Sequence, residues 1–299
     1  MSPAYPGSKE LCRASVVTIL ALTGLIWIGA LLAGFLGALT GLGGGVVIVP
    51  LLTLVFGVDI HYAIGASLVS VAATSSAAAA VYLKQGFANI RIALVLELAT
   101  TLGAVGGAVL ALQLPTAAIA VLFGLALLLS AYLSARPPQP RSETRAQDKL
   151  AGVLELEGEY PDTAGPQSYR VRSVGLGFGL MGVAGMLSGL LGIGSGALKV
   201  LAMDQVMGVP FKVSTATSNF MIGVTAAASA GVYLSRGYID PGLTMPVMLG
   251  VLVGSLLGAR VFIAAKPKLL RPVFAGVIAL LAVQMIAGAF GGRFVDGAL

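Results

Sequence analysis

The stretch Gly41-Leu42-Gly43-Gly44-Gly45-Val46-Val47-Ile48-Val49-Pro50 is a cluster of glycines inside apolar sequence, and a related stretch, Gly192-Ile193-Gly194-Ser195-Gly196-Ala197-Leu198-Lys199-Val200, occurs in the second half of the chain. Glycine clusters destabilise helices and leave backbone N–H and C=O groups without helical partners. Within a membrane, such groups are tolerated only where protein or a water-lined cavity satisfies them. Paired interruptions in corresponding places of two halves therefore indicate the binding site of a transporter.

The composition is that of a polytopic membrane protein. Of the 299 residues, 57% are hydrophobic and only 10% are charged, against roughly 25% charged residues in a soluble domain. The net charge of +6 does not indicate nucleic acid, because the basic residues lie in short loops beside apolar segments, where they orient a membrane protein. With one cysteine and one histidine, no metal set or catalytic constellation can be assembled, so we expect no metal, no cofactor and no enzymatic activity.

The two glycine breaks belong to a longer internal repeat. A shift of 151 residues aligns residues 34–107 with residues 185–258 without a gap, and 21 of the 74 positions are identical. The identical pairs include Gly41/Gly192, Gly43/Gly194, Gly45/Gly196, Gly57/Gly208, Ser67/Ser218, Thr74/Thr225 and Gly86/Gly237. This pattern indicates one unit that has been duplicated.

The repeat divides the chain into two transmembrane halves, residues 14–135 and 173–292, joined by a hydrophilic linker of residues 136–172. The linker begins with prolines and carries many charges, so we expect a flexible cytoplasmic segment that transport does not need. Residues 116–135 form one of the uncharged spans, whereas the 13 residues of 46–58 are too short to cross a membrane alone.

Each half has an odd number of hydrophobic segments, which predicts that the halves are inserted in opposite orientations. The excess of lysine and arginine in the linker places that segment in the cytoplasm. The predicted fold is an all-α transmembrane bundle of two inverted-topology repeats, with paired glycine-rich broken helices and about 8–10 membrane segments.

At the glycine breaks the chain resembles the TauE/SafE family of membrane permeases, the sulfite exporter family. In that family each half opens with a G-x-G-G-G-type break, a short helix and a proline, as in Gly41 to Pro50 here. The second half departs from this pattern at Ser195, Lys199 and Leu201. The resemblance implies transport of sulfite or small organosulfonates such as sulfoacetate across a bacterial inner membrane, driven by a proton or ion gradient. The sequence leaves the anion, the direction, the coupling ion and the oligomeric state open, and it is compatible with a homo-oligomer.

The glycine breaks are the candidate anion site. Free backbone N–H groups and the N-terminus of a short helix, which carries about +0.5 charge, suit an anionic head group. Hydroxyl and amide side chains on the following helices can donate further hydrogen bonds, and Asn219 is the strongest such candidate because its amide cannot easily satisfy itself. The predicted substrate-binding residues are Gly43, Gly44, Gly45, Ser67, Gly194, Ser195, Gly196, Lys199, Thr217, Ser218 and Asn219. The alternatives are that the glycines serve only close helix packing and that the hydroxyls bond their own helix.

Ionisable residues inside apolar sequence are costly and therefore indicate function. Lys199 could contact the anion, or it could pair with Asp204, five residues further along the chain. Glu97 could carry a coupled proton, or it could lie near the membrane interface, because it is close to the start of its span.

The sequence is also compatible with functions other than transport. The glycine runs do not form a phosphate-binding loop, because no Gly-Lys-Ser/Thr follows either of them. An anion channel or a membrane scaffold that transports nothing could be built from the same segments. Only a transporter shows saturable, stoichiometric flux, so anion counterflow in liposomes distinguishes these functions.

Overall fold

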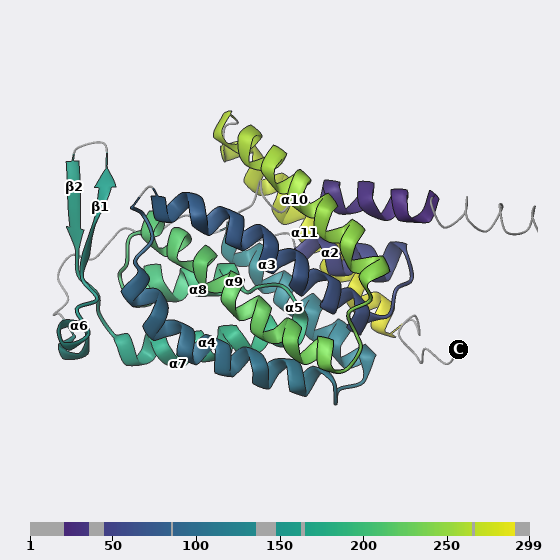
Figure 1. Cartoon of the computed structure of the whole chain (residues 1–299), viewed down its shortest axis with the longest axis horizontal. Coiled ribbons are helices and arrows are strands. Elements are labelled where there is room, and N and C mark those ends of the chain that lie inside the picture. The colour runs from purple at the N-terminus through teal and green to yellow at the C-terminus, as the bar shows by residue number, and fades with distance from the viewer. Residues whose placement is uncertain are drawn as a thin grey trace, which may run out of the picture.

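The computed structural model describes residues 21–35, 45–84, 86–135, 148–162, 165–264 and 267–290. They form a helical bundle with a small β-hairpin at one end (Figure 1). The first half contains the helix Ala21–Phe35, α2 (Gly45–Pro50) with its π-helical continuation η1 (Leu51–Val55), α3 (Ile60–Lys84), α4 (Ile90–Ala111) and α5 (Thr116–Ala135). The second half contains α7 (Val174–Leu191), α8 (Gly196–Leu201) with η2 (Ala202–Val206), α9 (Phe211–Ser235), α10 (Pro241–Ala264) and α11 (Pro267–Phe290).

The helices of the two halves begin at equivalent positions. The first residues of α8, α9, α10 and α11 each lie 151 residues after the first residues of α2, α3, α4 and α5. The duplication predicted from the sequence is therefore present in the secondary structure. The opposite insertion of the two halves stays a prediction.

Two glycines that match in the repeat end the short helices. Gly57 and Gly208 have φ angles of +65° and +74°, a conformation that favours glycine. Each lets the next residue turn back onto the helix, so that Val58 N–H donates to the Leu52 carbonyl at 3.0 Å and Val209 N–H donates to the Met203 carbonyl at 2.9 Å. The repeat thus preserves the helix stops.

Other glycines interlock the two halves. A Cβ atom added at Gly103 of α4 would lie 2.1 Å from the Gly182 carbonyl oxygen of α7, so only glycine permits this approach. At the equivalent place, Gly254 of α10 lies equally close to the carbonyl of Leu31. Each half therefore packs against the other through equivalent glycine contacts.

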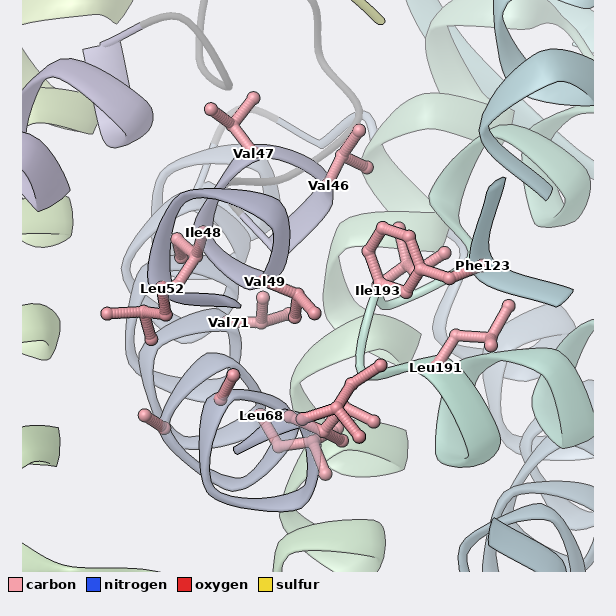
Figure 2. Packing of buried hydrophobic residues seen from close by; sticks show 14 of the residues in the cluster. Val46, Val47, Ile48, Val49, Leu52, Leu68, Val71, Phe123, Leu191 and Ile193 are labelled. Atoms are coloured by element: carbon pink, nitrogen blue, oxygen red, sulfur yellow. The ribbon is translucent and has the colours of Figure 1, made fainter. Parts of the chain in front are cut away.

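Several helices are suited to a membrane. α3, α4 and α7 are each at least 18 residues long, with mean hydropathies of 1.6, 1.9 and 1.8. Five shorter apolar helices accompany them in the described part of the chain: Ala21–Phe35, Gly45–Val55, Thr116–Leu129, Pro241–Leu257 and Ala279–Phe290. All residues of α2 are buried, and Val46, Ile48 and Val49 belong to the same apolar cluster as Phe123 and Ile193 (Figure 2). This helix accordingly lies within the bundle, as its short length predicts.

The linker is partly folded, which corrects two sequence-based expectations. Residues 149–153 form α6 (Lys149–Val153), and β1 (Gly158–Asp162) pairs antiparallel with β2 (Gly165–Tyr169), so the fold is not entirely helical. Leu156 and Val171 are fully buried in an apolar cluster with Ile92 and Met203. The part of the linker from residue 148 onward is thus docked on the bundle, because a few apolar side chains anchor an otherwise charged segment.

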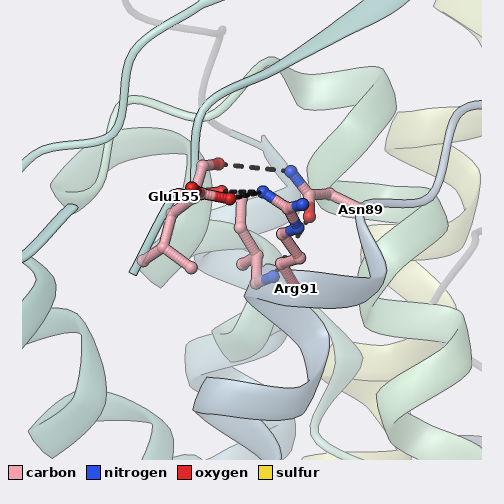
Figure 3. A network of polar contacts seen from close by, with 5 residues as sticks. Asn89, Arg91 and Glu155 are labelled. Carbon is pink, nitrogen blue, oxygen red and sulfur yellow. Dashed lines mark hydrogen bonds and ion pairs between the residues drawn. The ribbon is translucent and has the colours of Figure 1, made fainter. Parts of the chain in front are cut away.

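Polar contacts hold the docked linker at the start of α4. The Asn89 amide donates to the Tyr169 hydroxyl at 2.6 Å and to the Leu156 carbonyl at 3.2 Å. The same side chain caps α4 by accepting from the Ile92 N–H group. Arg91 forms an exposed ion pair with Glu155 (Figure 3). Asn89 is therefore the main polar link between the linker and the bundle.

Candidate functional site

The two glycine breaks meet in the structure. Gly45, the first residue of α2, lies so close to Gly192 that an added Cβ atom would be 2.7 Å from the Gly192 carbonyl oxygen. The same carbonyl accepts a hydrogen bond from Ser67 Oγ of α3 at 2.8 Å. Gly43 and Gly44 lie outside the described residues. The described end of the first break, Gly45, thus packs directly on the second break.

The second break has an unusual backbone. Gly192, Gly194 and Ser195 have φ angles of +69°, +77° and +44°, so the chain between α7 and α8 passes repeatedly through the left-handed region. For Ser195 this conformation carries a steric penalty that glycine avoids, and the first repeat has Gly44 at the equivalent position. The left-handed turns separate the end of α7 from the start of α8, so the first N–H groups of α8 have no partner within that helix.

Two buried hydroxyl groups beside this break have no hydrogen-bond partner. They are Ser195 Oγ at the start of α8 and Ser188 Oγ in the last turn of α7. Ser188 is fully buried and Ser195 is 9% exposed. An unsatisfied buried polar group costs about 1–3 kcal/mol, so these two hydroxyl groups are candidates for binding a polar ligand.

One face of α9 lines the second break. Ser218 Oγ lies 3.5 Å from the Gly196 carbonyl. Ile222, one turn further along, contacts the position where a Cβ atom of Gly194 would lie. Thr225 follows three residues later, which is about 4.5 Å along the helix axis. A continuous strip of α9 therefore runs from the break to Thr225.

Lys199, Thr225 and Glu97 form a buried polar chain at the end of that strip. Lys199 Nζ donates to Thr225 Oγ1 at 2.7 Å, and Thr225 Oγ1 has two acceptors for its one proton, Glu97 Oε1 at 2.8 Å and the Met221 carbonyl of its own helix at 2.7 Å. Lys199 is fully buried and Glu97 is 8% exposed. The partner of Lys199 is therefore the Thr225 and Glu97 pair, and the alternative of an ion pair with Asp204 is wrong, because the lysine side chain is directed at α9 and α4.

Thr217 and Asn219 do not face the break. The Thr217 hydroxyl accepts from the Asn89 backbone N–H at 3.1 Å, which places it at the docked linker. Asn219 Nδ2 donates to the Thr215 carbonyl one turn back in its own helix at 2.9 Å. The expectation that this amide could not satisfy itself was wrong, because the preceding turn of α9 supplies an acceptor.

Sequence reasoning did not single out Ser188 or the bridging role of Thr225. Ser188 replaces Gly37 of the first repeat, and this change from glycine to a polar residue near a break was the available signal. Thr225 has a threonine counterpart, Thr74, so its sequence position alone gave no sign of a special role. Its partners lie 26 and 128 residues away along the chain.

Comparison with known proteins identifies relatives over most of the chain. The family profile described as Sulfite exporter TauE/SafE matches residues 26–285. The Probable membrane transporter protein YunE of Bacillus subtilis is 28% identical over 264 residues, which cover 86% of this chain and 94% of that protein. The Probable membrane transporter protein YdhB, also of Bacillus subtilis, is 28% identical over 273 residues, covering 89% and 99%. A probable membrane transporter protein of Methanocaldococcus jannaschii is 25% identical over 285 residues, covering 89% and 96%. No solved structure matches the chain.

Proposed function

Because the chain belongs to the sulfite exporter TauE/SafE family, we propose that it is a secondary transporter of small sulfur oxyanions, sulfite or organosulfonates such as sulfoacetate. Its relatives are named as probable membrane transporters, so the chain is a multi-pass membrane protein of a transporter family and not an enzyme. The proposed location is a bacterial inner membrane. The proposed mechanism is alternating access around one site where the two glycine breaks meet.

The observation that carries this proposal is the junction of the two breaks beside a fully buried lysine. Gly45 contacts Gly192, and Lys199 begins one turn after Ser195, since its backbone N–H donates to the Ser195 carbonyl at 3.1 Å. A buried cation is costly and is retained where it binds an anion or a counter-ion. Here its backbone lies one turn after the break, its ammonium reaches Thr225 of α9, and the first N–H groups of α8 also favour negative charge.

The unpartnered hydroxyls of Ser188 and Ser195 fit the same ligand. A sulfite or sulfonate group has three oxygen atoms and accepts hydrogen bonds from several directions at once. Two hydroxyl donors, the first N–H groups of α8 and the Lys199 ammonium would together provide donors for such a group. The proposed anion would satisfy hydroxyl groups that otherwise lack partners.

The test is anion counterflow with the purified protein in liposomes. Vesicles loaded with unlabelled sulfite should transiently accumulate labelled sulfite, and a panel of sulfonates, sulfate and chloride should compete in order of affinity. A channel would give flux without saturation or counterflow, and a scaffold would give none. Either result would overturn the proposal.

A point substitution links this flux to the second break. Ser195→Gly suits the left-handed backbone, so the fold should be kept, but it removes the unpartnered hydroxyl. Loss of one hydrogen bond to a charged ligand should weaken anion affinity by roughly tenfold or more. Ser70→Ala is the matched control, because the Ser70 hydroxyl bonds only the Ala66 carbonyl of its own helix. Equal affinities in the two variants would place the anion elsewhere.

A further inference from the structure

The Lys199, Thr225 and Glu97 chain joins three helices that are distant in sequence. Lys199 comes from α8, Thr225 from α9 and Glu97 from α4. The Glu97 carboxylate also accepts from Thr100 Oγ1 and Thr101 Oγ1, both at 3.0 Å. The Thr225 hydroxyl, which lies between the two charged groups, is the only bridge between them in the described part of the chain. Both charged groups are thus held by hydrogen bonds, and the Thr225 hydroxyl lies between the ammonium and the carboxylate.

Among the described residues, each of these two charges has the other as its only charged neighbour. In the described part of the chain, no charged group other than Lys199 acts on Glu97, and none other than Glu97 acts on Lys199. The packed helix α7 has no titratable residue. The remaining titratable residues on the surrounding described elements, none of which acts on this pair, are Arg91, Tyr132, Asp204, Lys212 and Tyr233.

This chain of polar groups joins the two halves, with Glu97 from the first and Lys199 and Thr225 from the second, and the repeat gives it no counterpart. In the repeat, the residue equivalent to Lys199 is Ile48, the one equivalent to Glu97 is Met248, and the one equivalent to Thr225 is Thr74. Ile48 is fully buried, and the Thr74 hydroxyl bonds the Ser70 carbonyl of its own helix at 3.0 Å. Helix packing therefore needs no charge at these positions. The pair therefore occurs in one of the two equivalent arrangements, the one that includes α8 of the second half.

We propose that Glu97 is the proton-binding group of the transporter and that it takes up one proton when an anion binds to Lys199. This inference rests on the proposed function, which it extends by naming the coupling ion. In the empty site, Lys199 is positive and Glu97 is negative, so the net charge is zero. When a monovalent anion binds to the ammonium, Glu97 accepts a proton from the medium and becomes a neutral carboxyl group. The loaded site is again neutral.

The burial of the pair explains why anion and proton would move together. If the anion binds without a proton, the net charge of the site is −1. If a proton binds without the anion, the net charge is +1. A net charge in a buried, low-dielectric site is strongly disfavoured, so both partly loaded states are rare. Only the empty and fully loaded forms would cross between the two access states, which is the requirement for coupling without leakage.

The experiment uses methanesulfonate, or another monovalent sulfonate that shows counterflow, because its sulfonate group stays ionised across the pH range. Binding to the purified full-length protein is measured by calorimetry in two buffers with different heats of ionisation. We expect uptake of one proton per anion bound, and an affinity that falls by about tenfold per pH unit where Glu97 is ionised in the free protein. An infrared difference spectrum should show the C=O band of a newly protonated carboxyl group.

Substitutions show which carboxyl group gives this infrared band. It should disappear in Glu97→Gln and persist in Thr74→Val, the matched control in the other half. Lys199→Met combined with Glu97→Gln removes both charges together, so no lone charge is left buried, and this variant should fold but lose anion binding. Anion binding without proton uptake, or a carboxyl band that survives in Glu97→Gln, would overturn the inference while counterflow still upheld the proposed function. Absence of counterflow with every anion would instead overturn both.

Discussion

Substitution of Thr225 by valine removes the bridge between Lys199 and Glu97 while keeping the volume of the side chain. The Thr225 hydroxyl accepts from Lys199 Nζ at 2.7 Å, and its one proton has two acceptors, Glu97 Oε1 at 2.8 Å and the Met221 carbonyl of its own helix at 2.7 Å. A hydrogen bond to a charged group contributes about 1.5–3 kcal/mol. Because the two charges still attract each other after the substitution, we expect a net loss of about 3 kcal/mol in the free energy of unfolding.

Thr74→Val is the matched control, since Thr74 occupies the equivalent position in the first repeat. Its hydroxyl bonds only carbonyl groups of its own helix, those of Ser70 and Val71. Loss of such a bond should cost about 0.5–1 kcal/mol. Unfolding of both variants in mixed micelles is followed by circular dichroism as the fraction of denaturing detergent rises. If the two variants unfold at the same detergent fraction, the polar chain does not stabilise this state and the reasoning fails.

Three further predictions concern packing and the linker. Gly189→Ala should destabilise the protein by about 1–3 kcal/mol, because the new Cβ atom would lie 1.9 Å from a backbone carbonyl oxygen of α4. Gly179→Ala, in open space on the same helix, should be neutral or stabilising. Similar unfolding midpoints for the two variants would contradict the assigned role of the Gly189 contact. Asn89→Ala should expose residues 148–172 to limited proteolysis, whereas Arg91→Ala, which breaks only an exposed ion pair, should not; equal cleavage rates would refute the assigned role of Asn89. Burial raises the pKa of Tyr169 above its ordinary value of 10.0. The contribution of Tyr169 to docking of the linker is therefore complete below pH 10 and is lost as the pH rises through the higher pKa of the folded state. Cleavage of the linker should accelerate only at strongly alkaline pH, and faster cleavage between pH 7 and pH 9 would contradict this.

The positions of the helices could be predicted because their signals are local. The span 116–135 coincides with α5, and the two short apolar pieces became α2 with η1 and α8 with η2. Uncharged stretches define length, and the repeated glycines Gly57 and Gly208 define where helices stop. The meeting of the two breaks also followed from the repeat, because equivalent interruptions of a duplicated fold tend to meet at the interface between the halves.

The polar chain could not be predicted, because the spans are apolar all round and periodicity does not reveal which face of each helix is buried. Lys199 and Glu97 are 102 residues apart, and only the approach of α4, α8 and α9 brings them to one hydroxyl group. The docked linker was missed for a different reason. Its average composition is hydrophilic, yet Leu156 and Val171 are fully buried against the bundle, in one apolar cluster with Ala151 and Tyr160.

The position of the bound anion tests the account most directly. Selenite is a heavier analogue of sulfite, and anomalous X-ray scattering from its selenium atom would locate it in crystals of the protein. The account predicts a selenium site within hydrogen-bonding reach of Ser195 and the Lys199 ammonium, at the junction of the two glycine breaks, and its loss in the variant that combines Lys199→Met with Glu97→Gln. A selenium site remote from both breaks, or one that persists in that variant, would contradict it.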